Sequence, residues 1–261
     1  MRPVPVFMYH HVNSHQGDTV TVTPEVFEGQ MRFLYESGYQ TLRIEELMDY
    51  IAGSYSLKKK AAVITFDDGW LDNYLFAVPI LREYRINTTV FIVTDRIEHA
   101  SASTSSLPES IPTHNESKAL LRQGEASRVS LNWRLIGEMA GTGLVEFYSH
   151  TKSHRKCSLL SEHELVEELR ESKEIIEKRL GRQCPYLCWP YGDYSPAAAR
   201  IAKDAGYRGL FTTLHGVVTV GSDPFAIKRI VVKDKVKWFK NRTTVYTSPL
   251  LSMLYLKVKK K

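Results

Sequence analysis

The chain has 261 residues, of which 43% are hydrophobic, with 11 prolines and 15 glycines. This length is enough for one sizeable hydrophobic core and is common for a single α/β barrel. The composition excludes a disordered, collagen-like or coiled-coil protein. Because the three cysteines form no regular framework, we expect no disulfide scaffold and interpret Cys157, Cys184 and Cys188 as ordinary thiols.

The formal net charge of +6 is concentrated near the C-terminus. Residues 228–242 hold seven lysines and arginines against the single carboxylate of Asp234, and the last five residues add four lysines. A basic end favours anionic partners, and a solvated tail is an equally good interpretation. Nucleic acid is a poor fit, because the basic run has little aromatic interleaving beyond Trp238 and Phe239.

The first ten residues lack the apolar core of a secretory signal, and no stretch approaches the roughly 18–20 apolar residues that span a bilayer. These features predict a cytoplasmic protein. Residues 249–256 are apolar and precede lysines, so residues 246–261 are predicted to form a basic amphipathic tail. That tail would either lie on an anionic membrane at its inner face or close the barrel as a last helix.

Strand-like and helix-like segments alternate along the chain, which indicates an α/β fold with a parallel sheet or barrel. Thr23-Pro24 has the pattern of a helix start, Ser161 and Glu164 form a capping box, and Gly181 suits a helix end. The expected strands are residues 4–9, 61–66, 88–93, 144–148, 186–189 and 209–213. The expected helices lie near residues 24–37, 44–52, 71–81, 133–140, 162–180 and 196–205.

Residues from about 98 to 130 interrupt this alternation. The segment contains a serine-rich run and two prolines, Pro108 and Pro112. Such a composition predicts a long mobile insertion, either a loose loop or a lid over a site.

Three polar motifs each follow the end of an expected strand: Asp67-Asp68, His150 and Pro190-Tyr191-Gly192. In parallel α/β folds the carboxyl ends of the strands lie at one rim, where side chains converge on a ligand. We therefore expect these three distant segments to meet at one point in space.

His150 and His154, four residues apart, together with a carboxylate make a familiar catalytic metal set. Of two adjacent carboxylates, one can bind the ion while the other accepts a proton, and Gly69 suits a tight turn behind them. Each motif alone has a structural interpretation, because Asp-Asp-Gly is a common turn. A zincin is excluded, since Thr151 stands where that motif requires a glutamate.

The three motifs resemble those of the polysaccharide deacetylases, the carbohydrate esterases with the NodB-homology domain. Residues 65–70 (TFDDGW) look like the first motif, residues 149–154 (SHTKSH) match the second, and residues 189–192 (WPYG) are similar to the third. Their order and spacing agree over residues 4–232. The resemblance implies a distorted (β/α) barrel with about seven parallel strands, formed by residues 1–245.

The resemblance also implies roles for individual residues. Asp67 would be the general base, and Asp68, His150 and His154 would hold a divalent metal, usually Zn²⁺. The backbone N–H of Tyr191 would help to stabilise the tetrahedral oxyanion.

The sequence departs from the family pattern in two places. The third motif usually begins with an arginine that orients the base, but Leu187 and Cys188 stand there. Residues 8–12 (MYHHV) are similar to a branch of the family in which a late arginine replaces it, which implies that Arg229 orients Asp67; a surface role is the alternative. The catalytic acid is not placed by any motif. His10 either lines the site or is a core histidine, and His215 is the other candidate but is expected to be structural.

The function implied is metal-dependent hydrolysis of the N-acetyl group of an amino sugar, with release of acetate, during cell-envelope glycan biosynthesis. The expected substrate is an N-acetylated glycan or a lipid-linked saccharide precursor. A catalytically impaired carbohydrate-binding relative is the first alternative. A glycosyltransferase is the second, and it would have no use for His150 and His154 together.

Overall fold

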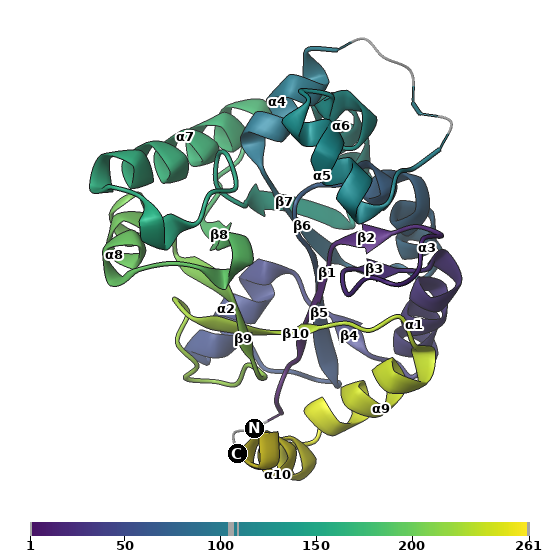
Figure 1. The fold of residues 1–261 in the computed structure, drawn as a ribbon. Coiled ribbons are helices and arrows are strands. Elements are labelled where there is room, and N and C mark those ends of the chain that lie inside the picture. The colour runs from purple at the N-terminus through teal and green to yellow at the C-terminus, as the bar shows by residue number, and fades with distance from the viewer. Residues whose placement is uncertain (1, 104–106, 109, 260–261) are drawn as a thin grey trace.

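The computed structural model describes residues 2–103, 107–108 and 110–259. Seven parallel strands form a closed barrel in the order β1-β10-β9-β8-β7-β6-β5, and β1 closes the ring because it pairs with both β10 and β5. The barrel predicted from the resemblance is therefore confirmed (Figure 1). The barrel strands are β1 (Val6–Tyr9), β5 (Ala61–Phe66), β6 (Thr88–Ile92), β7 (Val145–Ser149), β8 (Tyr186–Cys188), β9 (Gly209–His215) and β10 (Ile227–Val231).

Three short strands lie outside the ring. β4 (Gln40–Thr41) extends the pairing along the first half of β5, whose second half pairs with β6. β2 (His11–Val12) and β3 (Thr21–Val22) form a separate parallel pair directly after β1. The pair matters for the site because it holds the segment that follows His10.

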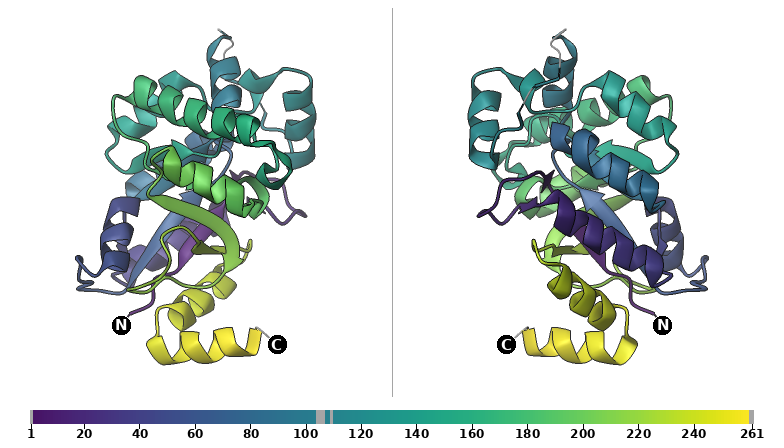
Figure 2. Two further views of the ribbon diagram at one scale, coloured as in Figure 1. Left: turned by 90° about the vertical axis from the view of Figure 1, so that its left-hand side faces the viewer. Right: turned by 90° about the vertical axis from the view of Figure 1, so that its right-hand side faces the viewer.

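Helices surround the barrel and cover its outer face (Figures 1 and 2). Every residue of β5, β6 and β7 is buried, as expected for strands between a barrel core and a layer of helices. The helices are α1 (Pro24–Glu36), α2 (Ile44–Ala52), α3 (Val78–Glu83), α4 (Thr94–Ser101), α5 (His114–Arg122), α6 (Trp133–Gly141), α7 (Glu162–Leu180), α8 (Pro196–Asp204), α9 (Val236–Tyr246) and α10 (Pro249–Lys259).

The local signals read from the sequence act as expected at several helix ends. Ser161 and Glu164 form the capping box of α7, and Gly181 ends that helix in the left-handed conformation. The segment expected as one helix near residues 71–81 contains a π-helical turn over Asn73–Ala77, which precedes α3 with Pro79 in its first turn. Proline has no backbone N–H to donate to the preceding turn, and that turn is π-helical, with hydrogen bonds that span one residue more than in an α-helix.

Residues 98–130 were predicted to be a mobile insertion, either a loose loop or a lid, and the loose-loop interpretation is wrong for most of that segment. It contains the end of α4, the whole of α5 and a 3₁₀ turn at Ala126–Arg128. α5 begins with a capping box, because the Thr113 hydroxyl accepts from the Glu116 N–H and the Glu116 carboxylate accepts from the Thr113 N–H. The serine-rich composition hid this start signal; residues 104–106 of that run lie outside the described residues.

Most of the described residues that were expected to form a tail belong to the helix α10, Pro249–Lys259. α9 and α10 lie at one end of the molecule, whereas α4, α5 and α6 lie at the other (Figures 1 and 2). α10 packs through Tyr255, whose ring lies 5.7 Å from that of Tyr246, and Ser252 is buried. Its other face exposes four apolar side chains: Leu250, Leu251, Met253 and Leu254. Within the described residues no helix combines the length and the apolar character needed to cross a bilayer.

We predict that Thr113→Ala destabilises α5 by about 1 kcal/mol, because the capping hydroxyl is lost. Hydrogen exchange should become faster for the amides of residues 114–122 and stay unchanged in α7. Asn115→Ala, a change of an exposed side chain in the first turn of the same helix, is the control. Equal protection of residues 114–122 in the wild type and Thr113→Ala would contradict the proposed role of the cap.

Candidate active site

The polar motifs converge at the carboxyl end of the barrel. Asp67 and Asp68 follow β5, His150 follows β7, and Cys188 ends β8. Asp67, Asp68 and His150 line a cavity of about 190 Å³. Its polar lining consists of His10, Asp67, Asp68, His114, Lys118, His150, His154, Tyr191 and Thr213.

Asp67 is held by a buried arginine. Nη1 of Arg229 donates to Oδ1 of Asp67 at 2.7 Å and Nη2 donates to Oδ2 at 2.8 Å, and both residues are almost fully buried. Burial alone would raise the pKa of Asp67, but the Arg229 guanidinium and the nearby His150 outweigh it and lower the pKa to about 2. Asp67 is therefore ionised at neutral pH.

Asp68 points away from Asp67, toward the two histidines. Its backbone is left-handed, with φ of 76°, and Gly69 continues the turn with φ of 72°. A side chain at Gly69 would place its Cβ 3.0 Å from Ile92, so the turn needs glycine both for its conformation and for the space. The turn gives two adjacent carboxylates entirely different partners.

Asp68, His150 and His154 form a donor set for a divalent ion. Nε2 of His154 lies 3.0 Å and Nε2 of His150 lies 3.9 Å from Oδ1 of Asp68. One oxygen or nitrogen atom from each residue can lie within 4.8 Å of the other two. Two imidazoles and a carboxylate that converge in this way are a donor set typical of catalytic Zn²⁺.

Hydrogen bonds and burial determine the tautomer and the charge of these metal-binding groups. Nδ1 of His150 lies 2.7 Å from the carbonyl oxygen of Cys188, to which it can only donate, so Nε2 keeps its lone pair. Burial is the largest influence on His150 and lowers its pKa to about 4, which keeps the ring neutral at neutral pH. Burial opposes ionisation of Asp68 as well, but His154 and Arg96 hold its pKa well below the usual range. These residues fit a metal ion.

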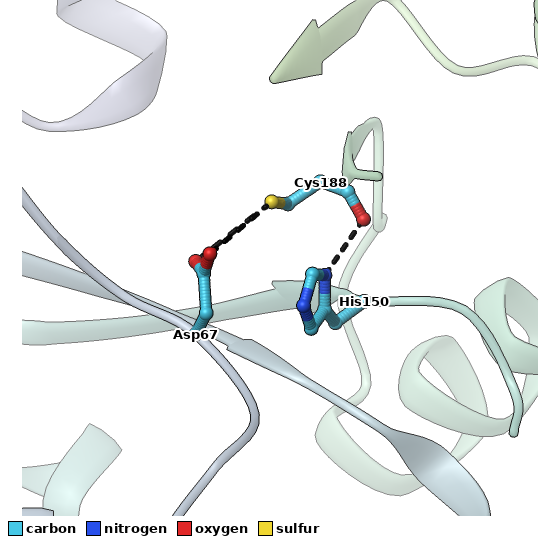
Figure 3. Close-up of side chains that lie close together, drawn as sticks. All are labelled: Asp67, His150 and Cys188. Carbon is cyan, nitrogen blue, oxygen red and sulfur yellow. Dashed lines mark hydrogen bonds between the residues drawn. The ribbon is translucent and has the colours of Figure 1, made fainter. Parts of the chain in front are cut away.

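A second grouping, formed by Asp67, His150 and Cys188, does not fit one (Figure 3). Both oxygens of Asp67 are bound to Arg229, and the Cys188 thiol donates to them at 3.7 Å. Burial raises the pKa of Cys188 well above its ordinary value, so the sulfur stays protonated, whereas a metal ligand must be a thiolate. Cys188 therefore belongs to the surroundings of Asp67.

His10 and Tyr191 also lie where the sequence analysis expected site residues. Nε2 of His10 lies 3.9 Å from Oδ2 of Asp67 on the wall of the cavity, and burial lowers its pKa. Tyr191 has a left-handed backbone with φ of 60°, and its ring lies 4.7 Å from that of His154. His215 bonds to the hydroxyl of Tyr246 at 3.1 Å and lines a separate cavity beside α9.

A chain of buried polar groups that the sequence analysis did not find reaches the same cavity. Asp72 accepts from Nδ1 of His11 at 2.8 Å, and Nε2 of His11 lies 3.1 Å from Nδ1 of His114. Burial is the main influence on His114 and lowers its pKa to about 4. The Thr113 capping box, which predicts a helix starting at His114, is the sequence signal that could have drawn attention to it.

Two further residues hold Asp68 in place and were also not anticipated. Nε1 of Trp70 donates to Oδ2 of Asp68 at 3.0 Å, and Nη1 of Arg96 donates to Oδ1 at 3.1 Å. The Trp70 ring stacks on His11, with centroids 4.4 Å apart, so the Asp72–His11–His114 chain is packed against the support of Asp68. Trp70 lies within the TFDDGW motif, whereas Arg96 has no signal in the sequence.

Comparison with known proteins agrees with this geometry. Residues 54–210, more than half of the chain, match the family model described as polysaccharide deacetylase. The chain therefore belongs to the polysaccharide deacetylase family, and it is a hydrolase of the class that acts on the C–N bond of N-acetyl sugars. The resemblance carried by the three motifs is confirmed.

Individual relatives span most of the chain. YxkH of Bacillus subtilis is 27% identical over 229 residues, which cover 88% of this chain and 71% of that protein. A poly-beta-1,6-N-acetyl-D-glucosamine N-deacetylase of Staphylococcus aureus is 25% identical over 236 residues, covering 87% and 73%. Among solved structures, the Streptococcus pyogenes deacetylase PplD in complex with acetate has a TM-score of 0.78 at 23% identity, covering 95% of this chain and 99% of that one. IcaB from Ammonifex degensii has a TM-score of 0.75 at 23% identity, covering 95% and 98%.

We predict that Arg229→Met lowers the free energy of unfolding by about 3–5 kcal/mol at pH 7, because it leaves the Asp67 carboxylate buried and unpaired. In the wild type the folded-state pKa of about 2 lies below the unfolded value of about 3.9, so this contribution is present above pH ~4 and lost as the pH falls toward 2. In the variant, burial raises the pKa of Asp67, so folding is penalised most at neutral pH. The difference between the two proteins should therefore shrink on acidification.

Urea unfolding at several pH values, with a chelator present throughout, measures this difference. Arg229→Met/Asp67→Asn is the control, since removing both charges should restore much of the lost stability. A difference between wild type and Arg229→Met that stays constant from pH 7 to pH 3 would mean that the pair does not set the protonation of Asp67.

Proposed function

We propose that this chain hydrolyses the N-acetyl group of N-acetylglucosamine units in a glycan, in a metal-dependent reaction that releases acetate. The observation that carries the proposal is the division of labour between adjacent carboxylates. Arg229 keeps Asp67 ionised and away from the cation site, whereas Asp68 faces His150 and His154. Metal-dependent amide hydrolysis uses this combination of a base and a cation site, whereas sugar binding without catalysis does not require it.

A divalent ion, which we propose to be Zn²⁺, would be held by Asp68, His150 and His154 and would polarise the acetyl carbonyl and acidify a water molecule. Asp67 accepts the proton of the attacking water, because Arg229 keeps the carboxylate ionised and fixes its orientation. Cys188 and Thr65 surround the same guanidinium and leave it no freedom to rotate.

The remaining residues act on the oxyanion and on the leaving amine. The N–H of Tyr191, on the left-handed turn beside His154, donates to the oxyanion in our proposal. In our proposal His10, whose Nε2 lies on the cavity wall 3.9 Å from Asp67, donates a proton to the amine nitrogen as the C–N bond breaks. Asp67 then returns to His10 the proton that it took from the water. Acetate and the free amino sugar are the products.

The type of substrate is supported by the relatives. The Staphylococcus aureus relative is named for poly-β-1,6-N-acetyl-D-glucosamine, which supports a polymer or oligomer of this sugar as substrate. A lipid-linked precursor at the inner membrane face is the narrower proposal. It rests on the exposed apolar face of α10 at Leu250, Leu251 and Leu254 and on the neighbouring Lys257.

We predict that Asp67→Asn lowers acetate release from N-acetylglucosamine oligomers by about 10²–10⁴-fold, because it removes the general base. Since the donor set is unchanged, one divalent ion per chain should still bind, as measured by elemental analysis after dialysis. His154→Ala should instead lose the ion, and acetate release with it. Asp204→Asn, which changes an exposed carboxylate of α8, is the control and should behave as wild type.

Two results would contradict the proposal in different ways. No acetate from the metal-loaded wild type, with any β-1,4- or β-1,6-linked oligomer, would favour a carbohydrate-binding relative. Full activity in the presence of a chelator would remove the metal from the mechanism while leaving the hydrolase class intact.

A further inference from the structure

A second cavity of about 430 Å³ adjoins the catalytic one. Lys118, His154 and Tyr191 line both cavities, so the two are continuous. The second cavity, here called the α4–α5 groove, is otherwise bounded by Asp95, Arg96 and His99 of α4, by Leu121 and Arg122 of α5, and by Gly124, Ala126 and Ser153. A sugar chain whose N-acetyl group enters the catalytic cavity would extend into this groove.

The groove carries an excess of positive charge. Arg96, Lys118 and Arg122 are cationic at neutral pH, and Asp95 is the one carboxylate in the lining. Arg96 is partly balanced by Asp68 at 3.1 Å. Burial raises the pKa of Asp95. Lys118 and Arg122 are both exposed, and within the described residues neither forms an ion pair.

The geometry of α5 fixes these charges relative to the site. His114, Lys118 and Arg122 are four residues apart, so they lie along one face of the helix. His114 is anchored to the barrel through His11 and Asp72, and the face therefore continues from the catalytic cavity into the groove. Like charges four residues apart repel each other, which costs stability unless an anion lies between them.

We propose that the α4–α5 groove binds an oxyanion, either a carboxylate or a phosphate, on the sugar next to the N-acetyl sugar that is deacetylated. Lys118 and Arg122 donate charge-assisted hydrogen bonds to that group. The same charges repel the ammonium group of a neighbouring glucosamine, so a glycan that is already deacetylated binds less well. This inference rests on the proposed function, and it specifies the substrate as an acidic N-acetylated glycan.

The test compares how the metal-loaded protein binds and deacetylates three oligosaccharides, two tetrasaccharides and one trisaccharide. Tetra-N-acetylchitotetraose is neutral, hyaluronan tetrasaccharide carries carboxylates beside N-acetylglucosamine, and tri-N-acetylchitotriose 6-phosphate carries a phosphate. For each, acetate release gives kcat/KM, and isothermal titration gives Kd without requiring turnover. The two acidic compounds distinguish a carboxylate ligand from a phosphate ligand.

We expect at least one acidic oligomer to bind more tightly than tetra-N-acetylchitotetraose. The preference should weaken between about 50 and 500 mM NaCl, because the Debye length falls from more than ~10 Å to less than ~8 Å over that range. Lys118→Gln/Arg122→Gln should reduce the ratio of acidic to neutral affinity by about three- to tenfold, because two exposed charge contacts are lost. Lys59→Gln/Lys60→Gln removes two exposed charges at the start of β5, at the far end of that strand from Asp67, and should leave the ratio unchanged.

The outcomes separate the two proposals. Acetate release from all oligomers with no acidic preference, unchanged in Lys118→Gln/Arg122→Gln, would overturn the groove proposal and leave the hydrolase intact. If no oligomer releases acetate, the proposed function fails, and the titrations then decide on the groove alone. Tight binding of an acidic oligomer that is lost in Lys118→Gln/Arg122→Gln supports it, and equal binding of all oligomers overturns it.

Discussion

The arrangement of the site depends on one buried ion pair, between Arg229 on β10 and Asp67 at the end of β5. The guanidinium has five N–H groups, and five contacts surround it. Nε donates to the Thr212 carbonyl, Nη1 to Thr65 and Asp67, and Nη2 to Asp67 and Cys188. One side chain therefore ties together β5, β8, β9 and β10, and a charge that would be costly to bury is fully satisfied.

This pair also explains how two adjacent aspartates come to have different partners and, in our proposal, different tasks. Asp67 has both oxygens on Arg229, whereas Asp68 turns through a left-handed backbone toward His154, Trp70 and Arg96. Without the arginine, burial would raise the pKa of Asp67, whereas Asp68 would keep its contacts with His154 and Arg96. The strained turn at Asp68 and Gly69 is thus a condition for the chemistry that we propose.

The sequence was most informative for the residues that directly follow the barrel strands. Asp67, Asp68, His150 and Tyr191 follow the ends of strands, and parallel strands bring such positions to one rim, so their convergence was predictable. Arg229 lies within a strand, 162 residues from its partner, and only the family resemblance indicated its role. The pairing of His11 with His114 spans 103 residues and follows no motif, so it required the structure.

The misinterpretation of residues 98–130 has a physical cause with consequences for the site. The composition of a segment is an average over all its residues, whereas the start of a helix depends on particular residues. Thr113 and Glu116 form the capping box of α5, and the serine-rich composition gives no sign of it. The rim of the barrel is already occupied by the groups that we propose to act on the acetyl carbon. Selectivity for the rest of the glycan must therefore come from elements outside the barrel, and α5, fixed to the barrel at His114, places Lys118 where both cavities meet.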